Sequence, residues 1–382
     1  MSAVLREAPD EWALGRAEGY PVCAPGPRTE TRYLVGWVSR RDEVSASRRV
    51  ACGPLARQLA RADEPAWRYA WQGESRDLDD YLRRHRATGL LVMRGCTVLA
   101  ERYQYDRGAS HRMTSMSMAK TVVGMLAGLA LEDGAIASLH DRACDYVPEL
   151  ADSPYGTTEL RHLLSMSSGV RFAESYNGAD DVALLARLSL LGASAGGPAT
   201  LAPFRERERA AGERFRYSSA ETQVLGLVVR AAARATLADY LSRKVWVPMG
   251  AEADATWLVD RGGYEAAFTG INATLRDYAR LGLLLADDGA IAGRQVVPES
   301  WVRAATTPQA GLEGLSGLFG YGYQTWVLRG ARRQFAFRGV RGQAILVDPR
   351  ARLVLVHTAA GEIGTPIGEL LALWRSVVDW AR

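Results

Sequence analysis

The chain has 382 residues, of which 48% are hydrophobic and 24% charged, and its formal net charge is +4. This composition fits a globular protein with a sizeable core and argues against a disordered or fibrous chain. The four cysteines, Cys23, Cys52, Cys96 and Cys144, are widely spaced, and the five histidines form no HExxH or HxH pair. We therefore expect neither a disulfide framework nor a metal site.

No run of about 18 uncharged apolar residues occurs, so the sequence predicts no transmembrane helix. The start, "MSAVLREAPDEWALGR", lacks the basic and apolar regions of a secretion signal, and we expect a cytoplasmic protein. Arginines alternate with acids, as in "RERERAAGERFR" (205–216), which favours a solvated surface over a phosphate-binding face. A nucleic-acid partner is therefore not expected.

The beginning of the chain, residues 1–75, is rich in Pro, Gly, Trp and Arg and shows no sustained period. We predict an irregular N-terminal extension there. The following segment, 77–89, carries apolar residues at helical spacing and predicts a helix closed by Gly89.

Two further elements follow. Residues 90–103 predict a β-hairpin that turns at Arg94-Gly95. A helix is predicted from about Ser117 to Asp133, with Gly134 ending it where a positive φ is needed.

The remaining pattern divides the chain into two regions. Residues 116–249 are predicted to be a mainly helical domain, while 76–115 and 250–382 together form a sheet domain. Near the end, short apolar runs separated by Gly or Pro predict successive antiparallel strands at 321–328, 333–339, 342–349 and 351–359. An amphipathic helix over 366–382 closes the chain. The fold class is α+β: an antiparallel sheet flanked by helices, with a helical region inserted.

Residues 113–126 read "MTSMSMAKTVVGML" and contain Lys120, one of two lysines in a chain whose other cations are arginines. Ser117 precedes it by one helical turn, which places both side chains on one face. Burial among apolar neighbours lowers the pKa of a lysine toward neutrality. A neutral amine can remove the serine proton, whereas an arginine, with a pKa above about 12, cannot. The pattern therefore predicts Ser117 as nucleophile and Lys120 as its general base.

A simpler interpretation is that Ser117 caps the helix and Lys120 extends into solvent. Chance alone gives about 0.1 Ser-x-x-Lys matches in such a chain, so the motif by itself does not decide. Downstream, "FRYSSAETQVLG" (215–226) places Tyr217 before an apolar helix, where its phenol can relay a proton between Lys120, Ser117 and a leaving group. A tyrosine in such a position is more often structural.

A third segment, "FRGVRGQAILVDP" (337–349), is a glycine-rich entrance to a strand. Gly339 lets a substrate approach the backbone, and the amide of Val340 can point at a carbonyl oxygen. An edge strand with a bulge explains this segment equally well when it is taken alone.

Three motifs thus occur in order along the chain: Ser117-Met118-Ala119-Lys120, Tyr217-Ser218-Ser219 and Arg338-Gly339-Val340. The set resembles the SxxK, YxN or YxS, and KTG-like motifs of the serine β-lactamase and penicillin-binding-protein superfamily. The resemblance runs from about residue 77 to the end. Within the class C-like branch, the sequence is particularly similar to the 6-aminohexanoate-dimer hydrolases and related esterases. It implies a β-lactamase/transpeptidase-like fold.

The resemblance also implies roles for individual residues. The backbone amides of Ser117 and Val340 would form the oxyanion hole. "SGVRFAESYNG" (168–178) is similar to a loop that carries an additional active-site tyrosine, here Tyr176. As a loop aromatic, Tyr176 either contacts the substrate or covers the cleft.

Two departures from the β-lactamase pattern bear on substrate recognition. Arg338-Gly339 follows Phe337 where β-lactamases have Lys-Thr-Gly, and Ser219 stands where they commonly have Asn, which weakens the network expected around Lys120. Efficient β-lactam turnover is therefore not expected. Arg338 or Arg341 can instead meet an anionic substrate group, although both also fit surface arginines at a strand edge.

Another serine offers a competing site. "GASAG" (192–196) matches the G-x-S-x-G nucleophile elbow, which requires a strand before the serine and a helix directly after it. A helical period precedes this segment and "GPATLAP" follows it, so we predict that Ser194 is a loop residue.

We therefore expect a serine hydrolase that cleaves an amide or ester bond of a small molecule through an acyl-enzyme, without a metal or other cofactor. The alternatives are an acyltransferase that uses the same acyl-enzyme, a weak β-lactamase, or a non-catalytic binding or peptidoglycan-sensing module. The presence of Ser117, Lys120 and Tyr217 argues against the last. Oligomeric state is left open, with a homodimer as one option.

Overall fold

A computed structural model describes residues 8–23, 30–309 and 317–382 of the chain. Its strands are β1 (Ser47–Val50), β2 (Ala60–Arg61), β3 (Arg68–Trp71), β4 (Glu74–Asp77), β5 (Ala87–Arg94), β6 (Thr97–Tyr103), β7 (Met113–Thr114), β8 (Ala255–Leu258), β9 (Ile271–Ala273), β10 (Ala290–Ile291), β11 (Arg294–Gln295), β12 (Phe319–Tyr321), β13 (Trp326–Leu328), β14 (Gln334–Gly339), β15 (Gln343–Asp348) and β16 (Leu353–Ala359). Its α-helices are α1 (Leu34–Ser39), α2 (Leu78–Arg84), α3 (Ala119–Glu132), α4 (Leu160–Leu164), α5 (Asp181–Leu190), α6 (Ser219–Ala232), α7 (Leu237–Leu241), α8 (Leu275–Ala286), α9 (Glu299–Ala305) and α10 (Gly368–Trp380).

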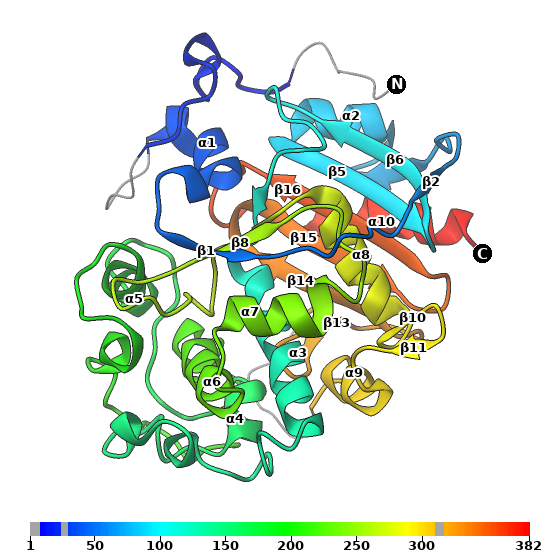
Figure 1. Cartoon of the computed structure of the whole chain (residues 1–382). Coiled ribbons are helices and arrows are strands. Elements are labelled where there is room, and N and C mark those ends of the chain that lie inside the picture. Colours follow the sequence, from blue (N-terminus) through cyan, green and yellow to red (C-terminus); the bar gives the residue numbers. More distant parts are fainter. Residues whose placement is uncertain (1–7, 24–29, 310–316) are drawn as a thin grey trace.

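The main sheet joins both ends of the chain (Figure 1). Its strand order is β12-β13-β14-β15-β16-β5-β6-β2, and the neighbours pair antiparallel except β2 and β6, which are parallel. A smaller sheet, in the order β1-β8-β9-β7, leads to the start of α3. The predicted α+β class, with a largely antiparallel sheet flanked by helices, is confirmed.

Alternation along the central strands separates two apolar layers. In β16, Val354 and Val356 belong to the core cluster that includes α8, while Leu353 and Leu355 belong to the cluster that includes α10. Successive strand residues point to opposite faces, and both faces here are covered by helices. This double burial explains why the strand sequence is continuously apolar instead of alternating with polar residues.

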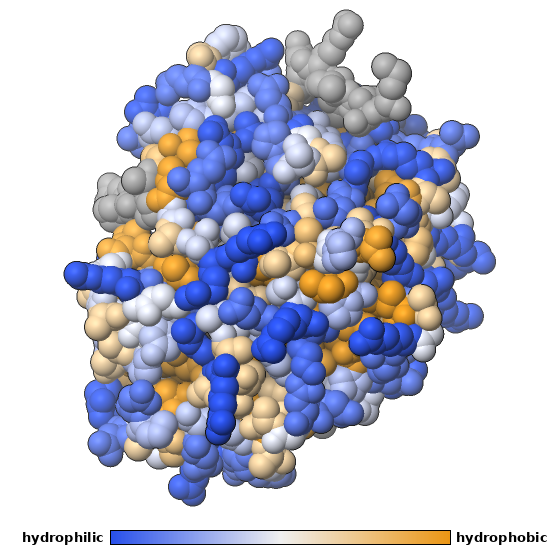
Figure 2. Space-filling model, in the orientation of Figure 1, coloured by the Kyte–Doolittle hydropathy of each residue, from blue (hydrophilic) through white to orange (hydrophobic). Residues whose placement is uncertain are grey.

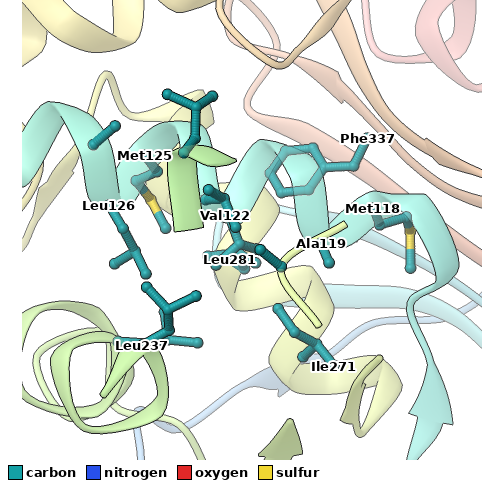
Figure 3. Packing of buried hydrophobic residues seen from close by; sticks show 14 of the residues in the cluster. Met118, Ala119, Val122, Met125, Leu126, Leu237, Ile271, Leu281 and Phe337 are labelled. Atoms are coloured by element: carbon teal, nitrogen blue, oxygen red, sulfur yellow. The ribbon is translucent and has the colours of Figure 1, made fainter. Parts of the chain in front are cut away.

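The third helix, α3, lies where the sheet meets the helical region (Figure 1). Every residue from Ala119 to Ala130 is buried, as expected for a helix surrounded by other elements. Figure 3 shows Met118, Ala119, Val122, Met125 and Leu126 of this segment near Leu237 of α7, Ile271 of β9, Leu281 of α8 and Phe337 of β14. A polar side chain on α3 is therefore taken out of water unless it faces a site.

Several predicted boundaries need correction. The helix predicted over 77–89 begins with a capping box at Asp77 and ends at Arg84, and Gly89 belongs to β5. A Cβ on Gly89 would lie 2.6 Å from Leu275 Cδ2, so this glycine lets α8 pack on the sheet and does not end a helix. The predicted hairpin over 90–103 forms, but it turns one residue later, at Gly95-Cys96.

The segment predicted as one strand over 321–328 is two strands, β12 and β13. The turn between them includes Gln324 at φ 54°, a left-handed conformation that reverses the chain. The other late strands and the C-terminal helix are confirmed, as is the end of α3, where Gly134 adopts φ 69°.

The predicted irregular extension, 1–75, contains short regular elements among its described residues. β1 pairs with β8, placing Ser47 opposite Leu258, and β2 pairs with β6. Strands of two to four residues are too short to produce a detectable period. The domain boundaries after 75, 115 and 249 remain predictions.

The mixed-charge segment 205–216 forms ion pairs on the surface, as predicted. The pairs are Arg171–Glu206, Arg209–Glu213 and Arg216–Glu208. Figure 2 shows one face of the molecule, which is mostly hydrophilic with hydrophobic patches between the charged residues. Within the described ranges, no helix combines the length and the apolar character that a membrane crossing requires.

Candidate active site

The chain around Ser117 turns from a short strand into a buried helix. After β7, the Ser115 amide donates to Ile271 O (2.7 Å) and the Ser115 hydroxyl accepts from the Ile271 amide (3.2 Å). Met116 then adopts φ 46°, and the chain enters the 3-10 turn η4 (Met116–Met118) and α3. Ser117 is half-buried between buried neighbours. This turn places its side chain at the edge of the core.

The Lys120 side chain is enclosed by hydrogen-bond partners and aromatic rings. Its Nζ lies 3.0 Å from Ser117 Oγ, 3.0 Å from Ser219 Oγ and 3.1 Å from Phe268 O, and the residue is 1% exposed. Burial lowers the pKa of Lys120 from 10.5 to about 8, although the nearby charge of Glu174 raises it. A substantial fraction of the amine is therefore neutral near pH 8.

The surroundings of Lys120 Nζ suit a neutral amine, which has two N–H donors and one lone pair. Phe268 O can only accept a hydrogen bond. The Ser219 hydroxyl donates to Glu174 Oε1 (2.9 Å), so its oxygen also accepts from Lys120. These two acceptors use both donors, which leaves the lone pair for the hydroxyl of Ser117. This arrangement is compatible with the predicted pair of nucleophile and general base, whose roles remain predictions.

Tyr217 lies next to this pair in an aromatic cluster. Its ring stacks on Trp326 with centroids 5.4 Å apart and meets Tyr321 edge-on at 6.2 Å. Burial and Glu174 raise the pKa of the phenol well above its ordinary value, although interactions with Ser117 and Arg338 lower it. The hydroxyl therefore stays protonated at neutral pH and acts as a donor.

The Lys120 amine lies over the face of the Tyr217 ring. Lys120 Nζ lies 5.0 Å from the ring centroid of Tyr217, and within the described ranges no hydrogen bond joins the amine to the phenol. A proton passed between them would therefore travel by way of Ser117 or the substrate.

Tyr176 lies in a loop that reaches the same site. It adopts φ 58°, and its amide donates to Asp180 Oδ2 (2.5 Å). Its hydroxyl donates to Glu174 Oε1, and its side chain interacts with Ser117. Burial and the Glu174 charge raise the pKa of the Tyr176 phenol, so this hydroxyl is also a donor. The structure thus brings Tyr176 to the nucleophile.

Glu174 is a site residue that the sequence analysis missed. Its Oε2 accepts from the Ser219 amide (2.8 Å), and its Oε1 accepts from the hydroxyls of Ser219 and Tyr176. Ser219, the departure from the usual Asn, thus remains in hydrogen-bond contact with Lys120 through an oxygen that Glu174 orients. The available signal was Glu174's position two residues before Tyr176.

The third motif lies at the end of β14, where the chain passes close to Ser115 and Met116. A Cβ on Gly339 would lie 2.7 Å from Ser115 O and 2.8 Å from Met116 Cβ, so only glycine permits this approach. The glycine is thus required by the protein's own backbone, whatever its contact with substrate. Val340 packs against the small core cluster that contains Met116. Its position fits the predicted oxyanion hole, which remains a prediction.

The two arginines of the third motif have different surroundings. Arg341 donates to Gly361 O (3.0 Å), and its guanidinium lies 5.8 Å from the ring centroid of Trp37 in the N-terminal extension. The Arg338 guanidinium lies 4.4 Å from the ring centroid of Phe319 and 5.1 Å from that of Trp326. Within 8–23, 30–309 and 317–382, Arg338 has no hydrogen bond and no ion pair. A substrate contact of either arginine stays a prediction.

The competing serine lies in a loop, as predicted. Ser194 follows α5, so a helix and not a strand comes directly before it, and its hydroxyl donates to Leu188 O (3.0 Å). Among the residues described, no group of His, Cys, Asp and Glu side chains could hold a metal ion.

Comparisons with known proteins agree with this geometry. A family model described as Beta-lactamase matches residues 76–373. The 6-aminohexanoate-dimer hydrolase of Paenarthrobacter ureafaciens is 31% identical over 299 residues, which cover 74% of this chain and 75% of that protein.

Two solved structures are similar in fold. A putative 6-aminohexanoate-dimer hydrolase from Bacillus anthracis superposes with a TM-score of 0.80 at 24% identity, covering 91% of this chain and 94% of the other. EstCE1, described as a hydrolase with promiscuous acyltransferase activity, superposes with a TM-score of 0.60 at 16% identity, covering 77% of this chain and 94% of the other.

Proposed function

This chain belongs to the β-lactamase family, and from that premise we propose that Ser117 forms an acyl-enzyme with the carbonyl of a small amide or ester. The chain is a hydrolase acting on amide or ester bonds and is related to the 6-aminohexanoate-dimer hydrolases. The observation that carries the proposal is the environment of Lys120 Nζ, with two acceptors for its protons and Ser117 Oγ at 3.0 Å.

In the acylation step, Ser117 Oγ bonds to the carbonyl carbon while its proton moves to Lys120 Nζ. The amides of Ser117 and Val340 donate to the oxygen that gains negative charge. When the bond to the leaving group breaks, the leaving atom takes a proton from the Tyr217 hydroxyl. Lys120 then returns its proton to Tyr217 by way of Ser117 Oγ or the substrate. Water then attacks the acyl carbon and gives one proton to Lys120 Nζ. The bond from that carbon to Ser117 Oγ breaks, Oγ takes a proton back from Lys120, and the acid is released. No metal or organic cofactor takes part in this scheme.

A substrate panel tests this proposal. The panel contains short p-nitrophenyl esters, linear amides including the 6-aminohexanoate dimer, and nitrocefin. We expect hydrolysis of esters or linear amides and an enzyme mass increased by one acyl group. That added mass should disappear in Ser117→Ala and persist in Ser194→Ala. Turnover without a covalent mass, or labelling that survives Ser117→Ala, would refute the assignment.

We also propose that the substrate carries a carboxylate or a similar anionic group, which Arg338 binds. Burial lowers the pKa of Arg338, yet a guanidinium stays charged in proteins, so the unpaired cation attracts an anion. The rings of Phe319 and Trp326 hold its plane in place. A carboxylate there would lie beside Tyr217, whose phenol interacts with the Arg338 charge.

Matched esters that differ only in a terminal carboxylate test this subsite. Arg338→Met should raise KM for the carboxylate-bearing ester about 10- to 100-fold, because a charge-assisted hydrogen bond is lost. The neutral ester should change by less than about threefold, since no charged partner is removed. Arg209→Met, which removes an exposed arginine paired with Glu213, is the control. An equal change for both esters would assign Arg338 to packing.

An acyltransferase is the second candidate, because an amine or alcohol can intercept the same acyl-enzyme. The fold neighbour EstCE1, described as having promiscuous acyltransferase activity, motivates this alternative. Adding an acceptor alcohol and measuring the ratio of transfer product to acid would separate the two. Weak β-lactamase activity, a cytoplasmic location and a homodimer likewise remain predictions.

A further inference from the structure

The turn after the third motif has a backbone that its surroundings must hold in place. The 3-10 turn η9 (Val340–Gly342) joins β14 to β15, and its middle residue, Arg341, adopts φ 65°. A residue with a side chain occupies this left-handed region at a cost of about 1 kcal/mol or more, so other contacts must stabilise it. The orientation of the Val340 amide depends on this turn.

His357 is directed at this turn from the middle of the sheet. It lies in β16, is 3% exposed, and places Nδ1 2.6 Å from Gly342 O. A carbonyl oxygen only accepts, so Nδ1 carries the ring proton. The other nitrogen, Nε2, lies 3.3 Å from the hydroxyl of Tyr81 in α2 and accepts a hydrogen bond from it. Burial lowers the pKa of His357 to about 4, so the ring is neutral with one fixed tautomer.

The other carbonyls of the turn are held by a second side chain and, at Arg341 O, also by the Gly361 amide, which donates at 3.2 Å. Gln343 Nε2 lies 3.4 Å from both Val340 O and Arg341 O, and it donates to Ala359 O at 2.7 Å. The Gln343 side chain is in turn fixed by the Ala359 amide, which donates to its Oε1 at 3.1 Å. Gly342 O has no comparable contact with Gln343. Among the described residues, its short hydrogen bond comes from His357 alone.

From these contacts we infer that His357 is a positioning residue for the oxyanion hole. It acts through Gly342 O and fixes the turn that presents the Val340 amide to the substrate carbonyl. A buried imidazole in a strand of aliphatic residues costs stability unless its polar atoms are paired, and both of its nitrogens are paired here. The inference rests on the proposed acyl-enzyme function, in which Val340 stabilises the oxyanion.

Two amide replacements separate this role from simple packing. His357→Asn can place an N–H near the position of Nδ1 and keep the bond to Gly342 O. His357→Gln places its amide near the position of Nε2 and leaves Gly342 O without that donor. A displaced oxyanion donor costs up to about 100-fold in rate. We therefore expect His357→Gln to lower kcat about 10- to 100-fold with little change in KM, and His357→Asn to stay within about threefold.

The measurement is hydrolysis of a p-nitrophenyl ester, with intact mass of the acyl-enzyme and the thermal midpoint recorded for each variant. Failure of the wild-type protein to form an acyl-enzyme at Ser117 would refute the proposed function itself. With a normal wild-type acyl-enzyme, equal kcat in the two variants would overturn the inference, whether both fall or neither does. A larger loss in Gln than in Asn at similar thermal midpoints supports it.

Discussion

Lys120 and Arg338 are two cations near Tyr217, and the protein surrounds them differently. Lys120 Nζ has three polar neighbours within 3.1 Å and is 1% exposed, and burial lowers its pKa to about 8. Arg338 lies on two aromatic faces and, in the part of the chain that the structure describes, forms no hydrogen bond and no ion pair. Burial lowers the pKa of both groups.

The same burial has different consequences because the two groups differ in chemistry. Burial favours the neutral form of an amine, so a larger fraction of Lys120 is unprotonated than of an exposed lysine at the same pH. A guanidinium keeps its charge and rests on the electron-rich faces of aromatic rings. On the proposed function, Lys120 would act as a reagent, while Arg338 would provide a fixed charge for a ligand.

The largest effect is expected when Lys120 is replaced by a residue with a permanent charge. Lys120→Arg should reduce acylation by about 10⁴-fold, because a guanidinium cannot accept the Ser117 proton. The rate of acyl-enzyme formation, followed by intact mass with a p-nitrophenyl ester, measures this loss.

The chain provides its own control for this variant. The other lysine, Lys244, forms an ion pair with Asp133 at 2.6 Å and is partly exposed. Lys244→Arg should leave acylation within about twofold, since surface ion pairs contribute little. An active Lys120→Arg would show that charge, and not basicity, is needed, and the contrast with Arg338 would disappear.

Tyr217 interacts with both cations, so removing its hydroxyl sharpens the comparison. Tyr217→Phe keeps the ring that stacks on Trp326 and that Lys120 faces. Turnover should fall about 10²- to 10³-fold, because the leaving group loses its proton donor. The loss should be greatest for amides, whose nitrogen must be protonated to leave. Steady-state kinetics with matched amide and ester substrates measures this difference.

Tyr264→Phe is a matched control, since Tyr264 packs under Arg230. A loss below about tenfold in Tyr217→Phe, or one equal for amides and esters, would limit this tyrosine to packing.

The comparison also explains what the sequence could predict. Ser117 in the 3-10 turn η4 and Lys120 in the first turn of α3 are three residues apart, so a local pattern places them together, and Lys120 Nζ lies 3.0 Å from Ser117 Oγ. Glu174 is linked to Lys120 through Ser219 only in the folded chain, and its place two residues before Tyr176, in a loop without periodicity, is a weak signal. Similarly, spacing could not separate Arg338 from Arg341, because the difference lies in Phe319, Trp326, Gly361 and Trp37, which are distant in sequence.

The glycines show the same limit. Gly339 was predicted from a substrate's need for room, yet the atoms that a Cβ would meet belong to Ser115 and Met116, more than 200 residues earlier in the chain. Gly89 was predicted to end a helix, and the side chain that requires it is Leu275. Where two distant segments pack closely, the sequence shows the glycine but does not show which segment packs against it.

The smallest predicted effect concerns Glu174, whose charge and the burial of Lys120 shift the pKa of Lys120 in opposite directions. Its charge raises the pKa of Lys120, which burial lowers to about 8. Because the base must be neutral, kcat/KM should rise with pH and level off above that pKa. Glu174→Gln removes the charge, so the pKa of Lys120 should fall and the rising limb should move to lower pH. The plateau should drop by at most about tenfold, since a glutamine oxygen still accepts from Ser219.

A pH profile of kcat/KM, measured with an uncharged ester so that Arg338 does not contribute, tests this shift. Glu213→Gln, which removes an exposed acid paired with Arg209, should leave the limb in place. A limb that stays fixed in Glu174→Gln would assign the limb to a group other than Lys120. A limb that moves to higher pH would mean that Glu174 helps to keep the amine neutral by orienting Ser219. Either result would change the account of how Lys120, unlike Arg338, becomes a base.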